Sequence, residues 1–129
     1  MKLNNGTSIP VIGLGTFKSR DDIVKNTVKS SVLEHGYRHI DTAKVYENEE
    51  MVGEALQECM AAGVKRKDLY VTSKLWKSDY NDIEGACRTS LRKLKLDYLD
   101  LYLVHWMLLP IDHEKKEWKV TSPPFHVIW

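Results

Sequence analysis

The apolar side chains of this chain recur with two different periods. Three stretches repeat them every three to four positions, which is typical of helices that bury one face. Shorter runs between these stretches are typical of strands. We expect strands at 11–15, 37–41, 69–74 and 99–105, and helices between Ser19 and Gly36, at 48–62 and at 82–95.

Polar residues mark the starts of the predicted helices. Ser19 with Asp22 three residues later forms a capping box for the first helix. Asn48 is suited to be the N-cap of the second helix. Three acidic residues near this second start suit the positive end of the helix dipole and need no catalytic role: Glu47, Glu49 and Glu50.

Three ionisable residues stand at the carboxyl ends of predicted strands. Lys74 lies 33 residues after Asp41, and His105 lies 31 residues after Lys74. A strand–helix–strand step takes roughly 30 residues, so this spacing predicts parallel strands whose carboxyl ends share one face. Active sites form on that face in α/β folds, so the three residues and Tyr46 can converge there. The plainer alternative is that Asp41 only ends a strand and Tyr46 packs on it.

Strand parity divides these side chains between two faces, because neighbouring residues of a strand point to opposite sides. If His105 points to the face of the sheet that lies away from the helices, Leu101 and Leu103 point to that face too. By the same count Tyr70 and Thr72 share the face of Lys74, whereas Leu69 and Val71 pack against helices. His39 shares the face of Asp41, where we expect a hydrogen-bonded filler of the interior.

Composition narrows the classes of partner. The 129 residues carry 19 basic and 18 acidic side chains, so the net charge of +1 makes no electrostatic case for nucleic acid or an anionic membrane. A small, neutral molecule is a better match to this net charge as a binding partner. No apolar run approaches the length of a signal peptide or a membrane span, so we expect a cytoplasmic protein. Cys59 and Cys87 lack metal-site spacing and are expected to be buried thiols.

Four motifs, in order, resemble those of one family. They are VIGLGTFK at 11–18, GYRHIDTAKVYENEEMVG at 36–53, VTSKLW at 71–76 and LDLYLVHW at 99–106. Together they are similar to the N-terminal half of an aldo-keto reductase. The resemblance implies an α/β fold, namely half of a (β/α)₈ TIM barrel, and a complete barrel takes roughly 250 residues.

The expected domain, 1–129, is therefore a partial barrel. It would contain about four parallel strands, three helices and the start of a fourth helix at 123–129. The Asn5-Gly6 pair between short apolar ends predicts a tight hairpin over 3–11, which the resemblance places across the bottom of the barrel.

The resemblance also implies an activity: NAD(P)H-dependent reduction of aldehydes and ketones to alcohols. Tyr46 would be the proton donor, because carbonyl reduction needs an acid for the developing alkoxide. The ammonium of Lys74 would favour the phenolate, Asp41 would hold Lys74, and His105 would orient the carbonyl.

The cofactor expected from the resemblance is NADPH, with NADH as the alternative. A GxG pair without a third glycine is a weak nucleotide signal by itself. The resemblance places five residues against the nicotinamide end: Gly15, Thr16, Phe17, Lys18 and Asp41. It places six around a small carbonyl substrate: Phe17, Val45, Tyr46, Trp76, His105 and Trp106.

The last residues depart from the family pattern. Met107 stands where proline commonly follows, and 107–123 is expected to be a long loop in which Trp118 could reach the pocket. Because relatives continue into four more strands, we expect the isolated 129-residue chain to be inactive. Two alternatives to an active reductase stay open: a half barrel that needs a partner and self-associates through its strand edges, and a non-catalytic binding or regulatory member.

Overall fold

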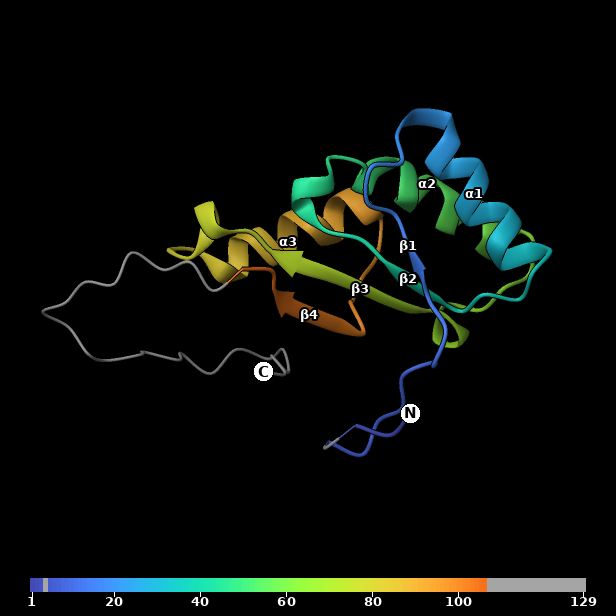
Figure 1. The fold of residues 1–129 in the computed structure, drawn as a ribbon, viewed down its shortest axis with the longest axis horizontal. Helices are drawn as coiled ribbons and strands as arrows, with labels where there is room; N and C mark the ends of the chain where they lie inside the picture. Colours follow the sequence, from blue (N-terminus) through green and yellow to red (C-terminus); the bar gives the residue numbers. More distant parts are fainter. Residues whose placement is uncertain (4, 107–129) are drawn as a thin grey trace, which may run out of the picture.

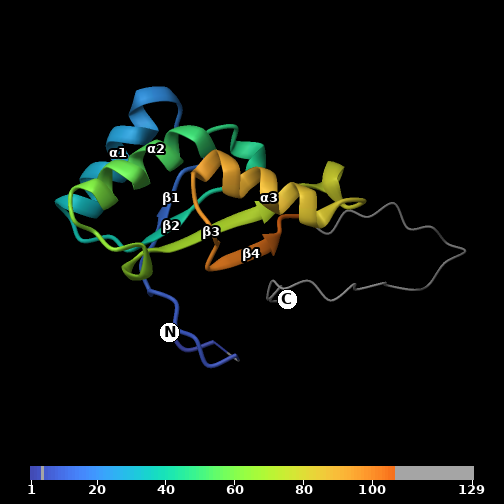
Figure 2. The same ribbon diagram turned by 180° about the vertical axis from the view of Figure 1, so that it is seen from behind.

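The computed structural model describes residues 1–3 and 5–106, and these form one parallel sheet under three helices. The sheet order is β1-β2-β3-β4, with strands at Leu14–Gly15, His39–Asp41, Tyr70–Leu75 and Leu101–Val104. The helices α1 (Asp21–Leu33), α2 (Glu49–Ala61) and α3 (Ile83–Leu94) all cover the same face of the sheet (Figures 1 and 2). The predicted α/β architecture with four parallel strands and three helices is confirmed. The loop and fourth helix predicted beyond Met107, with Trp118, lie outside the described residues.

The register brings the carboxyl ends of the strands together. Gly15 pairs with Asp41, Asp41 with Thr72, and Lys74 with Leu103. Within residues 5–106, three short 3₁₀ turns lie in the connections, and two of them follow strand ends: η1 (Lys44–Tyr46) after β2 and η3 (Lys77–Asp79) after β3. The third, η2 (Arg66–Asp68), precedes β3 at the opposite end.

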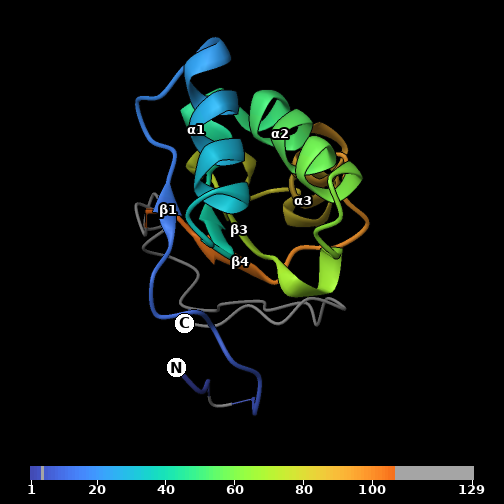
Figure 3. The ribbon, with the colours of Figure 1, turned by 90° about the vertical axis from the view of Figure 1, so that its right-hand side faces the viewer.

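The core lies between the sheet and the helices, and strand parity is confirmed there. Ile40, Leu69 and Val71 are buried in one apolar cluster with the inner faces of α1 and α2. A second cluster packs α3 on β3 and β4 through Cys87, Leu75 and Tyr102. The view in Figure 3 shows the three helices side by side above the strands.

His39 lies on the other side of the sheet. Its Nε2 is 3.0 Å from the Thr72 hydroxyl, and its ring meets the ring of Tyr70 edge-on at 5.2 Å. The hydrogen bond fits the expectation for His39, although the described helices do not cover this face and the side chain is only half-buried.

A glycine allows α2 to approach the end of α3. A Cβ on Gly53 would lie 2.6 Å from the carbonyl oxygen of Lys93 and 2.7 Å from the Cα of Leu94. Any side chain at this position would push the two helices apart. Packing between α2 and α3 therefore requires glycine at position 53, the last residue of the motif at 36–53.

The start of α1 differs from the prediction. The helix begins at Asp21, and Arg20 rather than Ser19 occupies the N-cap. The backbone takes the left-handed conformation at Lys18 (φ 60°) and again at Asp21 (φ 50°), which displaces Ser19 from the first turn. The capping box of Ser19 and Asp22 is therefore wrong. At α3, in contrast, the Asp82 side chain caps the helix by accepting from the backbone N–H of Gly85 at 2.9 Å.

The N-terminal hairpin forms as a single turn. Lys2 and Ser8 make one antiparallel bridge, and the Leu3 N–H donates to the Thr7 carbonyl at 2.8 Å. Gly6 takes a positive φ of 85°, as a tight turn requires. The hairpin hangs below the amino end of β1 (Figure 1), away from the strand ends that carry Asp41 and Lys74.

Candidate active site

Lys74 is the centre of a polar cluster at the carboxyl ends of β2 and β3. Its Nζ donates to Asp41 Oδ1 at 2.6 Å, to the Tyr46 hydroxyl at 3.2 Å and to the Thr42 carbonyl at 3.0 Å. The Lys74 side chain is only 12% exposed, so three oxygen partners compensate for the removal of its charge from water. The ammonium thus fixes the phenol of Tyr46 and the carboxylate of Asp41 in one place.

His105 follows β4 and completes the group. Its ring lies edge-on to Tyr46 at 5.6 Å and to Trp76 at 5.5 Å. Burial, and secondly the nearby Lys74 charge, hold the pKa of His105 below its ordinary value of 6.5, so the imidazole is neutral at pH 7. The His105 Nδ1 is buried and has no hydrogen-bond partner within residues 5–106. The structure therefore brings together the four side chains that are far apart in the sequence.

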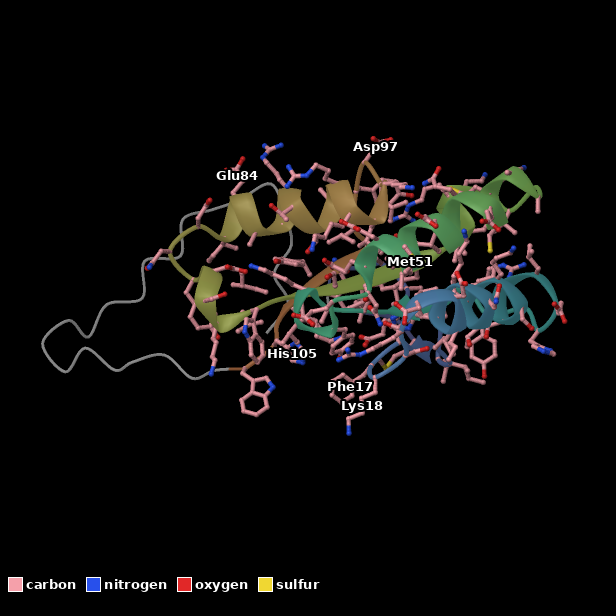
Figure 4. All side chains as sticks on the ribbon, turned by 90° about the horizontal axis from the view of Figure 1, so that it is seen from above. Phe17, Lys18, Met51, Glu84, Asp97 and His105 are labelled. Atoms are coloured by element: carbon pink, nitrogen blue, oxygen red, sulfur yellow. The ribbon has the colours of Figure 1, made fainter. Side chains whose placement is uncertain are left out.

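Aromatic rings form the rim of this cluster. Phe17, 61% exposed, lies 5.0 Å from the Tyr46 ring, and Trp106, 53% exposed, lies 6.1 Å from Trp76. Figure 4 shows Phe17, Lys18 and His105 along one side of the molecule, opposite Glu84 and Asp97. Val45 is half-buried in the same turn as Tyr46. The residues predicted to surround a substrate thus all lie on or beside the carboxyl ends of the strands.

The residues predicted to hold a cofactor lie at the end of β1. Gly15 is exposed and pairs with Asp41. Thr16 is buried, and both its N–H and its hydroxyl donate to the Asp41 carbonyl, at 3.0 and 3.1 Å. Lys18 is exposed, with its ammonium 5.5 Å from the Phe17 ring. The segment 15–18 is therefore bonded to the strand that carries Asp41.

Three contacts between loops were not predicted from the sequence. Asn48 bonds to the backbone of the β1–α1 loop, at Thr16 and Ser19. Lys44 forms an ion pair with Asp79, which joins η1 to η3. The Tyr80 hydroxyl donates to the Trp106 carbonyl. Each loop around the site is thus connected to the next one.

Glu49 stands at the start of α2 as expected, but its burial was not predicted. It is the first residue of α2, which suits the helix dipole, but it is only 2% exposed. Hydroxyls of Ser73 and Ser90 donate to its two oxygens at 2.6 and 3.2 Å. Burial raises the pKa of Glu49, and the two hydroxyls oppose this shift. An amphipathic pattern gives no sign of such a buried carboxylate.

Two classes of structure are absent from the described part of the chain. None of its helices has the length and apolar character needed to cross a membrane. No three His, Cys, Asp or Glu side chains within it gather closely enough to hold a metal ion.

Cys59 and Cys87 are buried, unpaired thiols, as predicted, and burial raises the pKa of Cys87 to about 11.

We expect the fold to lose stability between about pH 7 and pH 5. Burial is the main cause that holds the pKa of both His39 and His105 below 6.5 in the folded chain. The unfolded chain, with ordinary imidazoles, then binds more protons as the pH falls through 6.5, so the free energy of unfolding decreases. Urea unfolding midpoints at about pH 7.5 and about pH 5.5 measure the effect.

The matched variants are His39→Gln and His35→Gln, because His35 is exposed. The first should reduce the difference between the two midpoints, and the second should leave it unchanged. The Glu58 carboxylate acts in a lower range, since hydrogen bonds from Lys25 and Lys29 lower its pKa from 4.5 to about 2. The raised pKa of Glu49 acts in the opposite direction to the histidines, and Glu49 is present in the parent and in both variants. Equal midpoints at the two pH values would contradict the expectation.

Comparison with known proteins identifies the family. Residues 11–114 match the Aldo/keto reductase family. The chain belongs to this family. A "Methylglyoxal reductase DkgA" of Escherichia coli O157:H7 is 44% identical over 119 residues, covering 92% of this chain and 42% of that protein. The "Aldo-keto reductase family 1 member A1" of Gallus gallus is 54% identical over 108 residues, covering 81% of this chain and 33% of that protein.

Solved structures of family members contain the same fold. The aldose reductase of Schistosoma japonicum superposes with a TM-score of 0.80 at 48% identity, covering 83% of this chain and 36% of that one. An aldo-keto reductase of Bombyx mori in complex with NADP gives a TM-score of 0.76 at 44% identity, covering 81% and 36%. The strands and helices described above therefore match part of the family's TIM barrel. The chain spans about a third to two-fifths of the length of these relatives.

Proposed function

We propose that this chain supplies the catalytic side chains of an NAD(P)H-dependent carbonyl reductase that converts small aldehydes or ketones to alcohols. The observation that carries the proposal is the double contact of Lys74, whose ammonium holds Asp41 and the Tyr46 hydroxyl together beside the His105 ring. Family membership gives independent support, because the matched relatives include aldose and methylglyoxal reductases by name.

Each of the four residues has a distinct role in the proposal. The Tyr46 hydroxyl donates the proton that the developing alkoxide needs. The Lys74 ammonium stabilises the phenolate left behind, and Asp41 keeps that ammonium in place. His105 is neutral, so one of its ring nitrogens carries a hydrogen that can bond to the substrate carbonyl and orient it.

The residues at the end of β1 fit the nicotinamide end of a cofactor. The exposed Phe17 ring offers a flat apolar surface 5.0 Å from Tyr46, and the buried His105 Nδ1, which lacks a partner within residues 5–106, leaves a polar atom near the same place. We propose that Gly15, Thr16, Phe17, Lys18 and Asp41 contact the cofactor. When bound, it supplies the hydride. The NADP complex of the Bombyx mori relative supports NADPH as the cofactor, with NADH as the alternative.

The aromatic rim favours a compact substrate. Phe17, Trp76 and Trp106 surround Tyr46 and His105 on the open side of the cluster. Small carbonyl compounds bury most of their surface between such walls, while a few polar groups fix their orientation.

The test is a fusion protein. Residues 1–106 of this chain replace the matching segment of the Gallus gallus relative, which is 54% identical. We expect the fusion protein to oxidise NADPH in the presence of a simple aromatic aldehyde, followed by absorbance. A folded fusion protein that binds NADPH and leaves the aldehyde unchanged would refute the proposed function.

The open edges of β1 and β4 within residues 5–106 favour a second candidate, a half barrel that acts only with a partner. The described sheet has four strands, and the chain covers 33% of the Gallus gallus relative. In this candidate the same four residues operate once another polypeptide completes the barrel. The intact group of Asp41, Tyr46, Lys74 and His105 supports both candidates over a non-catalytic binding subunit.

A further inference from the structure

Asn48 connects two loops whose residues are assigned to different tasks. It lies between Tyr46, the proposed proton donor, and α2, and it is only 3% exposed. Its amide nitrogen donates to the carbonyls of Thr16 and Ser19, both at 2.8 Å. Its amide oxygen accepts from the Thr42 hydroxyl at 3.3 Å.

The orientation of this amide follows from its partners. The backbone oxygens of Thr16 and Ser19 can only accept hydrogen bonds, so the side-chain nitrogen must face them. With two carbonyls and one hydroxyl, the buried amide uses both of its donors and one acceptor. Asn48 therefore does not cap α2 with its side chain, although it occupies the N-cap position.

The two carbonyls bracket the segment that holds Phe17 and Lys18. Thr16 is already bonded to Asp41 at the end of β2, but the backbone turns sharply after it, with Lys18 in the left-handed conformation. Ser19 O is held by Asn48, and the Ser19 N–H donates to the Thr16 carbonyl at 3.2 Å. Asn48 thus fixes both ends of the turn that presents the Phe17 ring to Tyr46.

We propose that Asn48 is a positioning residue: it sets the 16–19 turn, and with it Phe17 and Lys18, relative to Tyr46, so that the nicotinamide end of the cofactor is bound in line with the proton donor. This inference rests on the proposed function. It assigns to Asn48 a role other than helix capping, because its two donors bind the loop and its oxygen accepts from Thr42 instead of a backbone N–H of α2.

The test variant is Asn48→Asp. Aspartate has nearly the same shape and is as good an N-cap as asparagine, but it has no donors for the two carbonyls. In the fusion protein we expect the KM for NADPH to rise about tenfold, the effect of losing two buried hydrogen bonds, with a smaller fall in kcat. If Asn48 only capped α2, Asn48→Asp would leave both constants unchanged.

A matched control lies at the other end of the sheet. Arg66 also bonds two backbone carbonyls, those of Leu69 and Tyr98, at 2.9 and 2.8 Å. We expect Arg66→Ala to lower thermal stability and leave the KM for NADPH within about twofold of the parent. Should Asn48→Asp fail to fold, Asn48→Ser keeps a capping acceptor and has one proton for two carbonyls, so its KM should rise as well.

Hydrogen exchange separates this inference from the proposed function. In both the 129-residue chain and the fusion protein, without cofactor, Asn48→Asp should speed exchange across 16–19 about tenfold. Arg66→Ala should leave that segment unchanged. Unchanged exchange across 16–19 in Asn48→Asp would overturn the inference, as would an unchanged KM in an active fusion protein. An inactive parent fusion protein that still shows the exchange difference would refute the proposed function alone.

Discussion

Tyr46→Phe should reduce the rate of aldehyde reduction by the fusion protein about 100- to 10,000-fold, the range that a general acid contributes. The substitution removes one oxygen atom, and that oxygen is the group that Lys74 holds at 3.2 Å. The proton is needed only as charge develops on the substrate oxygen, so the loss should fall on kcat rather than on affinity. NADPH affinity, measured by fluorescence titration, should stay within about twofold of the parent protein.

Tyr98→Phe is the matched control for this prediction. It removes the same atom from a tyrosine that is 42% exposed and packs on Arg66, at the amino end of the sheet. We expect its rate to equal that of the parent. If Tyr46→Phe kept its rate within a few-fold, the proton would come from another group, and the geometry around Lys74 would be structural.

The 129-residue chain by itself should neither reduce aldehydes as a monomer nor saturate with NADPH at low-micromolar concentration. Its four site residues are all present, so the loss would not come from the chemistry. The chain covers 36% of the Bombyx mori relative whose structure holds NADP, so most of that chain has no counterpart here. Binding energy from the remote parts of a cofactor positions its reacting end, so losing such contacts would lower the rate as well as the affinity. Within residues 5–106, β1 and β4 each pair on one side only, and such edges favour self-association.

Two measurements check this expectation on one sample. Light scattering after size-exclusion chromatography gives the oligomeric state, and NADPH fluorescence gives the affinity. The fusion protein is the control, because it carries the same residues 1–106 within a chain of family length. A monomer that binds NADPH at low-micromolar concentration would contradict the prediction. An active dimer would support the half barrel that needs a partner.

The sequence was sufficient for the architecture because its signals are regular. The intervals between Asp41, Lys74 and His105 reflect one strand and one helix per step, and the parallel register confirms this interpretation. The alternation of side chains also placed Leu69 and Val71 against the helices correctly. Once the face of one strand residue is known, the faces of all the others are known too.

The contacts between loops could not be predicted, for a physical reason. The partners of Asn48 lie 32 and 29 residues away, and Lys44 is 35 residues from Asp79. Local patterns describe what a residue can do with its neighbours, so asparagine before a helix favours a cap. The left-handed turns at Lys18 and Asp21 instead bring the backbone of the first loop to Asn48.

The ion pair between Lys44 and Asp79 has a consequence for attempts to redesign substrate preference. The Lys44 and Asp79 side chains are 34% and 17% exposed, and they join the turn that carries Tyr46 to the turn that follows Trp76. Grafting 76–80 from a relative without an acid at position 79 would leave the Lys44 ammonium half-buried and unpaired.

Substitutions in these two loops should consequently be non-additive, as neighbours in contact are. In a library that varies the Trp76 loop alone, every sequence without an acid at position 79 would lose the ion pair to the turn that carries the proton donor. Exchanging 44–45 and 76–80 together, both from the same relative, would change the wall of the pocket while keeping Tyr46 in place.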